Sequence, residues 1–249
     1  MVPLAPVFLD RPIAHRALHG PGRPENSRAA VRAAVAAGYG VEIDIQMSKD
    51  HHAMVFHDYD MKRLTGHRGP IQQRTVPELA DMPLLGGHEG VPTLTEVLRD
   101  VNGAVPLLIE IKDQDGRMGP KVGTLERAVA AALDGYGGPV AVMSFNPHTM
   151  AELARLLPGI PRGLTTCAFK ALEYPTLPAT VRSHLRAMPG LAEAGASFIS
   201  HDHKDLDMPE VAAQKARGLH VLCWTIRSPA DEAKARRIAD NVTFEGYAA

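Results

Sequence analysis

The stretch "VEIDIQMSKDHHAMVFH", Val41 to His57, contains two short apolar runs, each with the composition of a β-strand. The few residues between the runs, "MSKDHH", are far fewer than the roughly dozen that a parallel crossover requires. The two runs are therefore expected to form an antiparallel hairpin. A turn centred near residues 50–51 predicts that His57 lies opposite Asp44.

Candidate strands and helices alternate along the whole chain, which is typical of an α/β protein. The candidate strands cover residues 13–15, 41–46, 53–57, 105–111, 140–145, 162–166, 197–200, 220–225 and 242–244. The strand at 53–57 is the surplus member, because it only returns along its neighbour. The other eight predict a TIM-type (β/α)8 barrel.

Helix signals fall between the strands. Residues 27–37 are rich in alanine, with Asn26 as the expected cap and Gly38 at the end. "TLTE" at 93–96 is a capping box, and "NP" at 146–147 and "SP" at 228–229 each open a helix. We interpret residues 41–57 as a hairpin arm. Residues 59–104 are then a small insertion, too short to hold a core of its own, in one barrel domain over residues 1–249.

The composition argues against several partners. Of the 249 residues 22% are charged, with a formal net charge of −1, so neither nucleic acid nor an anionic membrane is favoured. No apolar stretch is long enough for a membrane helix, and the first residues lack the features of a signal peptide. Cys167 and Cys223 are isolated, so we expect a reduced, cytoplasmic protein. Nothing in the sequence indicates the oligomeric state.

Three acidic residues lie late in candidate strands, where barrel enzymes place their functional groups. Glu42 and Asp44 are two residues apart, so both side chains point to one face, and Glu110 follows an apolar run. Two carboxylates on an apolar face are costly unless they are neutralised. The sequence therefore predicts a site for a hard divalent cation, Mg²⁺ or Ca²⁺.

Two of the twelve histidines end apolar runs, "PIAH" at His15 and "AMVFH" at His57. His15 is followed by Arg16, and Lys112 shares a face with Glu110. Imidazoles beside cations suit an anion site that also transfers protons. His201 and His203 imitate a metal motif, but no third soft ligand lies nearby, so zinc is disfavoured.

Seven segments then resemble one known family, the glycerophosphodiester phosphodiesterases. They run in order through nearly the whole chain: "IAHR…PENS", "GVEIDIQMSKD", "VFHDYDMKRLTG", "PTLTEVL", "LLIEIK", "VMSFNP" and "VLCWTIRSPADEA". The resemblance implies a TIM-type barrel, a divalent cation and hydrolysis of glycerophosphodiesters to an alcohol and glycerol 3-phosphate.

The resemblance also implies roles for individual residues. It makes Glu42, Asp44 and Glu110 the metal ligands and His15 and His57 the acid–base pair. It assigns Arg16 and Lys112 to the phosphate.

Three features depart from the family's usual pattern. Ala17 stands where glycine usually follows His-Arg, and the chain ends "VTFEGYAA" with no room for a last helix. The barrel is therefore expected to be closed either incompletely or by the N-terminal segment. Residues 167–195 diverge most, which leaves the alcohol leaving group open.

Two aromatic residues at strand ends, Phe145 and Trp224, are expected to form apolar walls of the pocket, although core packing is an equal alternative for Trp224. Other functions stay open at this point. They are a lysophospholipase D-like or other phosphodiesterase, and a barrel that binds a phosphorylated polyol without turnover.

Overall fold

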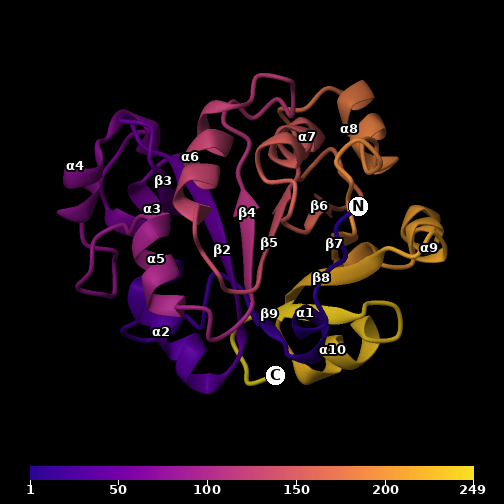
Figure 1. Ribbon diagram of the computed structural model, residues 1–249, viewed down its shortest axis with the longest axis horizontal. Helices are drawn as coiled ribbons and strands as arrows, with labels where there is room; N and C mark the ends of the chain where they lie inside the picture. Colours follow the sequence, from indigo (N-terminus) through magenta and orange to yellow (C-terminus); the bar gives the residue numbers. More distant parts are fainter.

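A computed structural model describes residues 1–249. Its centre is a closed barrel of eight parallel strands, in the order β1-β9-β8-β7-β6-β5-β4-β2, in which β1 pairs with both β9 and β2 (Figure 1). The strands are β1 (Ile13–Ala14), β2 (Gly40–Met47), β4 (Leu107–Ile111), β5 (Val140–Ser144), β6 (Arg162–Thr166), β7 (Phe198–Asp202), β8 (His220–Ile226) and β9 (Asn241–Phe244). The predicted TIM-type barrel is confirmed, and the alternative of incomplete closure is wrong.

Seven helices surround the barrel, one after each of the first seven parallel strands. They are α2 (Arg28–Ala37), α5 (Leu94–Val101), α6 (Thr124–Leu133), α7 (Pro147–Leu156), α8 (Ala179–Arg186), α9 (Pro209–Ala216) and α10 (Pro229–Ala235). The predicted caps at Thr93, Asn146 and Ser228 are confirmed, and each accepts a hydrogen bond from its own first turn. The α2 cap is Ser27, which accepts from the backbone N–H of Ala30, so the prediction of Asn26 was wrong.

The N-terminal segment covers one end of the barrel. Helix α1 (Val7–Asp10) lies against the base of β9, as Figure 1 shows. Leu4 and Phe8 pack onto apolar side chains that fill the base of the barrel: Ile13, Leu108, Ala141, Met143, Phe198 and Leu222. Gly163 makes room for this layer, because a Cβ there would lie 2.5 Å from the Phe198 ring. The base of the barrel is therefore filled, so a site inside the barrel has room only at the carboxyl ends of the strands.

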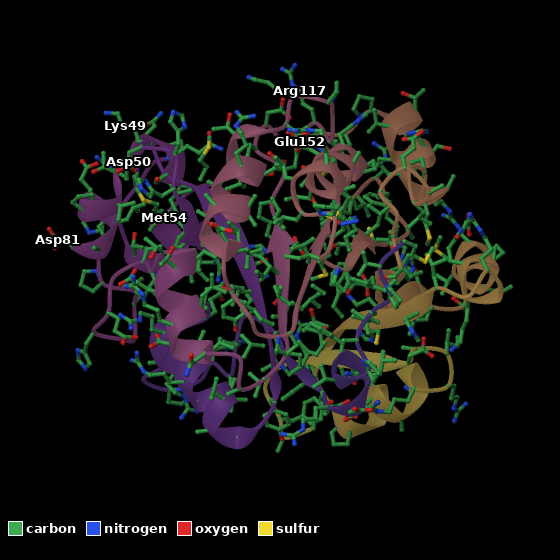
Figure 2. The ribbon with its side chains drawn as sticks, in the orientation of Figure 1. Lys49, Asp50, Met54, Asp81, Arg117 and Glu152 are labelled. Atoms are coloured by element: carbon green, nitrogen blue, oxygen red, sulfur yellow. The ribbon has the colours of Figure 1, made fainter.

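Strand β3 (Ala53–Val55) pairs antiparallel with β2, which confirms the predicted hairpin arm. Figure 2 shows Lys49 and Asp50 at the outer end of this arm. The register pairs Ile45 with Val55 and so places Phe56, not His57, opposite Asp44. The predicted pairing was wrong by one residue, because the turn is centred on residue 50 and not between residues 50 and 51.

The insertion carries α3 (Lys62–Thr65), the 3₁₀ helix η1 (Ile71–Gln73) and α4 (Val76–Ala80). It does have a small core, which corrects the prediction. Met54 and Phe56 of the arm pack there with buried residues of the insertion: Met61, Leu64, Ile71, Leu79, Leu84 and Val91. Two of the eight buried residues of this core belong to the arm, so the arm and the insertion share it. No helix of the chain combines the length and the apolar character needed to cross a membrane.

Candidate active site

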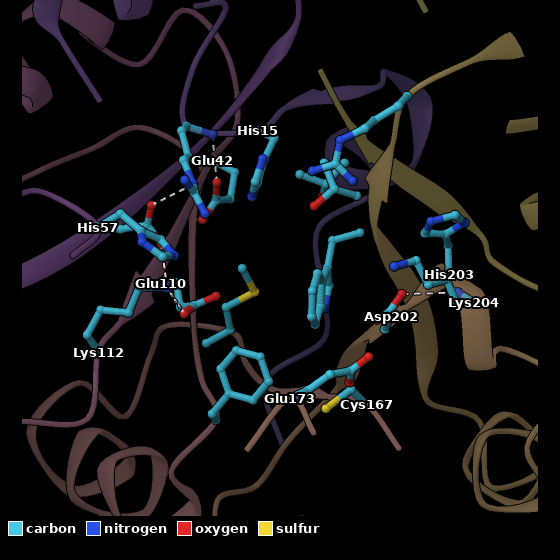
Figure 3. A pocket seen from close by; sticks show the side chains of 18 of the residues that line it. His15, Glu42, His57, Glu110, Lys112, Cys167, Glu173, Asp202, His203 and Lys204 are labelled. Carbon is cyan, nitrogen blue, oxygen red and sulfur yellow. Dashed lines mark hydrogen bonds and ion pairs between the residues drawn. The ribbon is translucent and has the colours of Figure 1, made fainter. Parts of the chain in front are cut away.

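All of the side chains predicted to form the site line one cavity of about 430 Å³ at the carboxyl ends of the barrel strands. Figure 3 shows His15, Glu42, His57, Glu110 and Lys112 on one side of this cavity, with Asp202, His203 and Lys204 across from them. The predicted residues that the cavity brings together are His15, Arg16, Glu42, Asp44, His57, Glu110, Lys112, Phe145 and Trp224.

The three carboxylates form a compact cluster. The pairing of β2 with β4 sets Asp44 directly beside Glu110, and Glu42 lies two residues earlier on β2. One oxygen of each carboxylate lies within 4.8 Å of the others, and all three residues are buried. No other group of three acidic, histidine or cysteine residues in the chain meets in this way.

Two cations lie against this cluster. The Lys112 Nζ is 2.7 Å from Asp44 Oδ1 and also bonds to Glu110 Oε1, while Arg16 Nε is 3.5 Å from Asp44 Oδ2. Burial alone would raise the pKa of Asp44, but the charges of Lys112, His57 and Arg16 lower it well below its usual range. Asp44 is therefore ionised at any working pH.

Glu42 differs from Asp44. Burial and the neighbouring charges of Asp44 and Glu110 raise its pKa well above the usual value, although it accepts a hydrogen bond of 2.8 Å from the Arg16 backbone N–H. Ionising Glu42 is costly because it is buried beside two other carboxylates. A divalent cation bound among the three would stabilise the ionised form. The all-oxygen donor set is the type that Mg²⁺ and Ca²⁺ prefer, so these residues fit such an ion.

Each predicted histidine is held by a carboxylate. His57 Nδ1 lies 2.7 Å from Asp58 Oδ1, and His15 Nδ1 lies 2.6 Å from Glu245 Oε2. The hydrogen bond from His15 and the proximity of the His19 imidazole, 3.5 Å away, lower the pKa of Glu245 well below its usual range. Burial lowers the pKa of His15 and favours its neutral form. An ionised Glu245 then accepts the Nδ1–H, and Nε2 keeps the lone pair that a base needs.

The segment after β1 is shaped by unusual backbone. Arg16 and Ala17 have φ angles of 52° and 65°, and Asn26 has 58°, all in the left-handed region. Ala17 thus takes a left-handed conformation that favours glycine, and its N–H donates to Glu42 O at 2.9 Å. Asn26 is fully buried and donates from Nδ2 to Asp44 Oδ2 at 2.9 Å. This amide, predicted to be a cap, instead orients a carboxylate of the cluster.

Aromatic side chains form one wall. Phe145 and Trp224 have ring centroids 5.7 Å apart in an edge-to-face arrangement, and Phe169 and Tyr174 pack beside Phe145. The Trp224 Nε1–H donates to Ser200 O at 2.9 Å. Trp224 therefore has features of both expectations, core packing and a pocket wall. Its indole N–H has a partner in the barrel, and its ring also lines the cavity.

Several lining residues were missed from the sequence, among them Glu173, Asp202, Lys204 and Arg227. Asp202 is an acidic residue at the end of β7, and the rule that identified Glu110, an acidic residue late in a strand, would also have identified it. His203 reaches the cavity, whereas His201 is buried with Nδ1 2.8 Å from Thr166 Oγ1. The two histidines therefore do not form a metal site.

This geometry agrees with comparisons to known proteins. Residues 15–242 match the model of the glycerophosphoryl diester phosphodiesterase family. The chain belongs to this family. It is therefore an enzyme, a phosphoric diester hydrolase.

Individual members of the glycerophosphoryl diester phosphodiesterase family show the extent of the similarity. The Bacillus subtilis protein YhdW is 27% identical over 89% of this chain and 88% of its own length. A glycerophosphodiester phosphodiesterase of Caldanaerobacter subterraneus is 30% identical over 61% of this chain and 65% of its own. A solved phosphodiesterase of Oleispira antarctica, in complex with the product sn-glycerol-3-phosphate, superposes with a TM-score of 0.76 at 25% identity. That superposition covers 96% of this chain and 93% of the other.

Proposed function

We propose that this enzyme hydrolyses a glycerophosphodiester to an alcohol and glycerol 3-phosphate, with Mg²⁺ or Ca²⁺ held by Glu42, Asp44 and Glu110. The observation that supports this most is the meeting of three carboxylates, two cations and two imidazoles in one cavity. The product complex of the Oleispira antarctica relative supports the choice of glycerol 3-phosphate.

The charge balance fits a phosphodiester. The acidic cluster carries three negative charges when ionised, and Arg16 and Lys112 carry two positive ones, which leaves one negative charge. When bound, a divalent cation would turn this balance positive and supply charge for the phosphoryl oxygens. Arg16 Nε is buried and has no hydrogen-bond partner in the structure, so it is free to donate to the phosphate.

The two imidazoles would move the protons. In the first half of the proposed reaction the neighbouring glycerol hydroxyl attacks phosphorus and gives its proton to His15 Nε2. The bond from phosphorus to the alcohol breaks, and the leaving oxygen takes a proton from His57. Water then opens the cyclic phosphate, giving its proton to His57, while His15 returns a proton to the glycerol oxygen.

Two carboxylate-held histidines favour turnover over simple binding. A barrel that only bound a phosphorylated polyol would need the cations but not two oriented imidazoles. The test is release of glycerol 3-phosphate from glycerophosphocholine, measured with the wild-type enzyme and with a variant carrying both His15→Ala and His57→Ala. The proposal predicts product from the wild type alone. A folded double variant with wild-type rates would contradict it.

A second candidate, lysophospholipase D-like activity, has one observation in its favour. A groove of about 500 Å³ adjoins the site and shares five lining residues with it: His57, Glu110, Lys112, Phe145 and Tyr174. Further along, its lining includes the apolar side chains of Ile111 and Met118 as well as Asp58, Asp60 and Asp113. The groove could take an acyl chain. Hydrolysis of lysophosphatidylcholine at a kcat/KM equal to or above that of glycerophosphocholine would support this candidate, and no detectable hydrolysis would reject it.

A further inference from the structure

One arginine of the insertion, Arg63, donates hydrogen bonds to two carboxylates, and each of these carboxylates contacts a different residue of the proposed active site. Arg63, in α3, donates from Nε and Nη2 to the two oxygens of Asp58 at 2.7 and 2.8 Å. The same guanidinium donates from Nη1 and Nη2 to the two oxygens of Glu25 at 2.8 and 2.9 Å. Two carboxylates from segments more than thirty residues apart are thus clamped by one side chain.

Each clamped carboxylate holds a residue of the site. Asp58 Oδ1 is 2.7 Å from His57 Nδ1, and Glu25 Oε1 is 2.8 Å from Arg16 Nη1. A continuous series of bonds therefore runs from His57 through Asp58, Arg63 and Glu25 to Arg16. No atom of Arg63 lines the cavity itself.

The geometry requires an arginine at this position. Without this guanidinium, Asp58 would be held only by His57 and Glu25 only by Arg16, and the two carboxylates would no longer share a cation. A lysine would neutralise the charge but has no planar fork, so it cannot hold both oxygens of both carboxylates. The side chain is 48% exposed, so these bonds contribute little to the free energy of unfolding.

We propose that Arg63 is a positioning residue that fixes the His57 imidazole through Asp58 and the Arg16 guanidinium through Glu25. This inference rests on the proposed function of His57 and Arg16. The insertion would then hold Arg63 in place, because the buried side chains of Met61 and Leu64 fix α3 on either side of it.

The test is a pair of double-mutant cycles with glycerophosphocholine as substrate. Arg63→Met should lower kcat/KM by about ten- to a hundredfold, as loss of a residue that orients a catalytic group does, through both a lower kcat and a higher KM. Added to Asp58→Asn, it should cause no further loss in kcat. Added to Glu25→Gln, it should cause no further rise in KM. Arg63→Lys should recover only part of the loss.

Arg68→Met is the matched control, because Arg68 is an exposed arginine of the same segment without a hydrogen bond to any carboxylate. It should leave kcat and KM unchanged. Losses from Arg63→Met that simply multiply with those of both carboxylate variants, or an equal loss in Arg68→Met, would overturn the inference.

A second readout does not depend on turnover. The ring ¹⁵N shifts of His57 should show the Nδ1–H form in the wild type and a mixture of tautomers in Arg63→Met. An unchanged tautomer in a folded variant would overturn the inference even if the enzyme proved inactive on glycerophosphocholine. A wild type without activity would instead count against the proposed function.

Discussion

Glu245→Gln should slow turnover without weakening substrate binding. The carboxylate lies 2.6 Å from His15 Nδ1 and is 19% exposed, so water screens the pair only in part. A hydrogen bond to a charged group contributes roughly 1.5–3 kcal/mol. At about 1.4 kcal/mol for each factor of ten, the variant should lose roughly 10- to 150-fold in kcat.

The assay is release of glycerol 3-phosphate under saturating and limiting substrate, which separates kcat from KM. KM should stay within about twofold, because Arg16 and Lys112 still hold the phosphate. Glu210→Gln is the control and should be neutral, because Glu210 is a half-buried glutamate of α9 that pairs with Arg186 outside the cavity lining. A kcat within a factor of two of the wild type, or a loss carried wholly by KM, would refute the role given to Glu245.

The same substitution has a pH signature in stability. The pKa of Glu245 is lowered by the hydrogen bond from His15 and by the nearby His19, so its ionised form stabilises the folded state above the ordinary value of 4.5. This stabilisation is lost as the pH falls below that value. The Tm difference between wild type and Glu245→Gln should therefore be largest near pH 7 and shrink below pH 4.5. A difference that grows on acidification would contradict the assignment.

Three further predictions concern the site. Glu42→Gln should abolish turnover yet leave the metal-free Tm unchanged or higher, because burial and its neighbours already raise the pKa of Glu42; full activity of this variant in chelator would contradict the metal assignment. His15→Ala and His57→Ala should each lower kcat by about 10²–10⁴-fold with little change in KM, whereas Arg16→Ala should also raise KM, and steady-state kinetics distinguish the two patterns. Trp224 is the only tryptophan and lines the cavity, so glycerol 3-phosphate should change its fluorescence; an unchanged spectrum at saturation would remove it from the pocket wall.

The barrel could be predicted from sequence because its strands are short and bounded by turn and cap signals. The predicted strand at 162–166 matches β6 at both ends, and the others differ by at most two residues at either end. The hairpin followed from loop length alone. Its register did not, because a shift of one residue in the five-residue connection between Met47 and Ala53 costs little locally but changes which residue faces Asp44.

The inner side chains of the site could be predicted from their strand-end positions, whereas the groups that orient them could not. Glu245 is 230 residues from His15, and Glu25 is 38 residues from Arg63, so no local spacing links either pair. The insertion core was missed for a similar reason, because Met54 and Phe56 come from the arm. The single-domain organisation, the cytoplasmic location and the choice between Mg²⁺ and Ca²⁺ stay predictions.

The most direct test of the central claim is a ³¹P NMR time course of glycerophosphocholine with metal-free enzyme, to which Mg²⁺ or Ca²⁺ is added part-way. We expect no reaction before the addition, glycerol 3-phosphate after it, and no response to either ion in a folded Glu110→Gln variant. Steady product formation in the presence of EDTA, or an equal response of Glu110→Gln to the added ion, would contradict it.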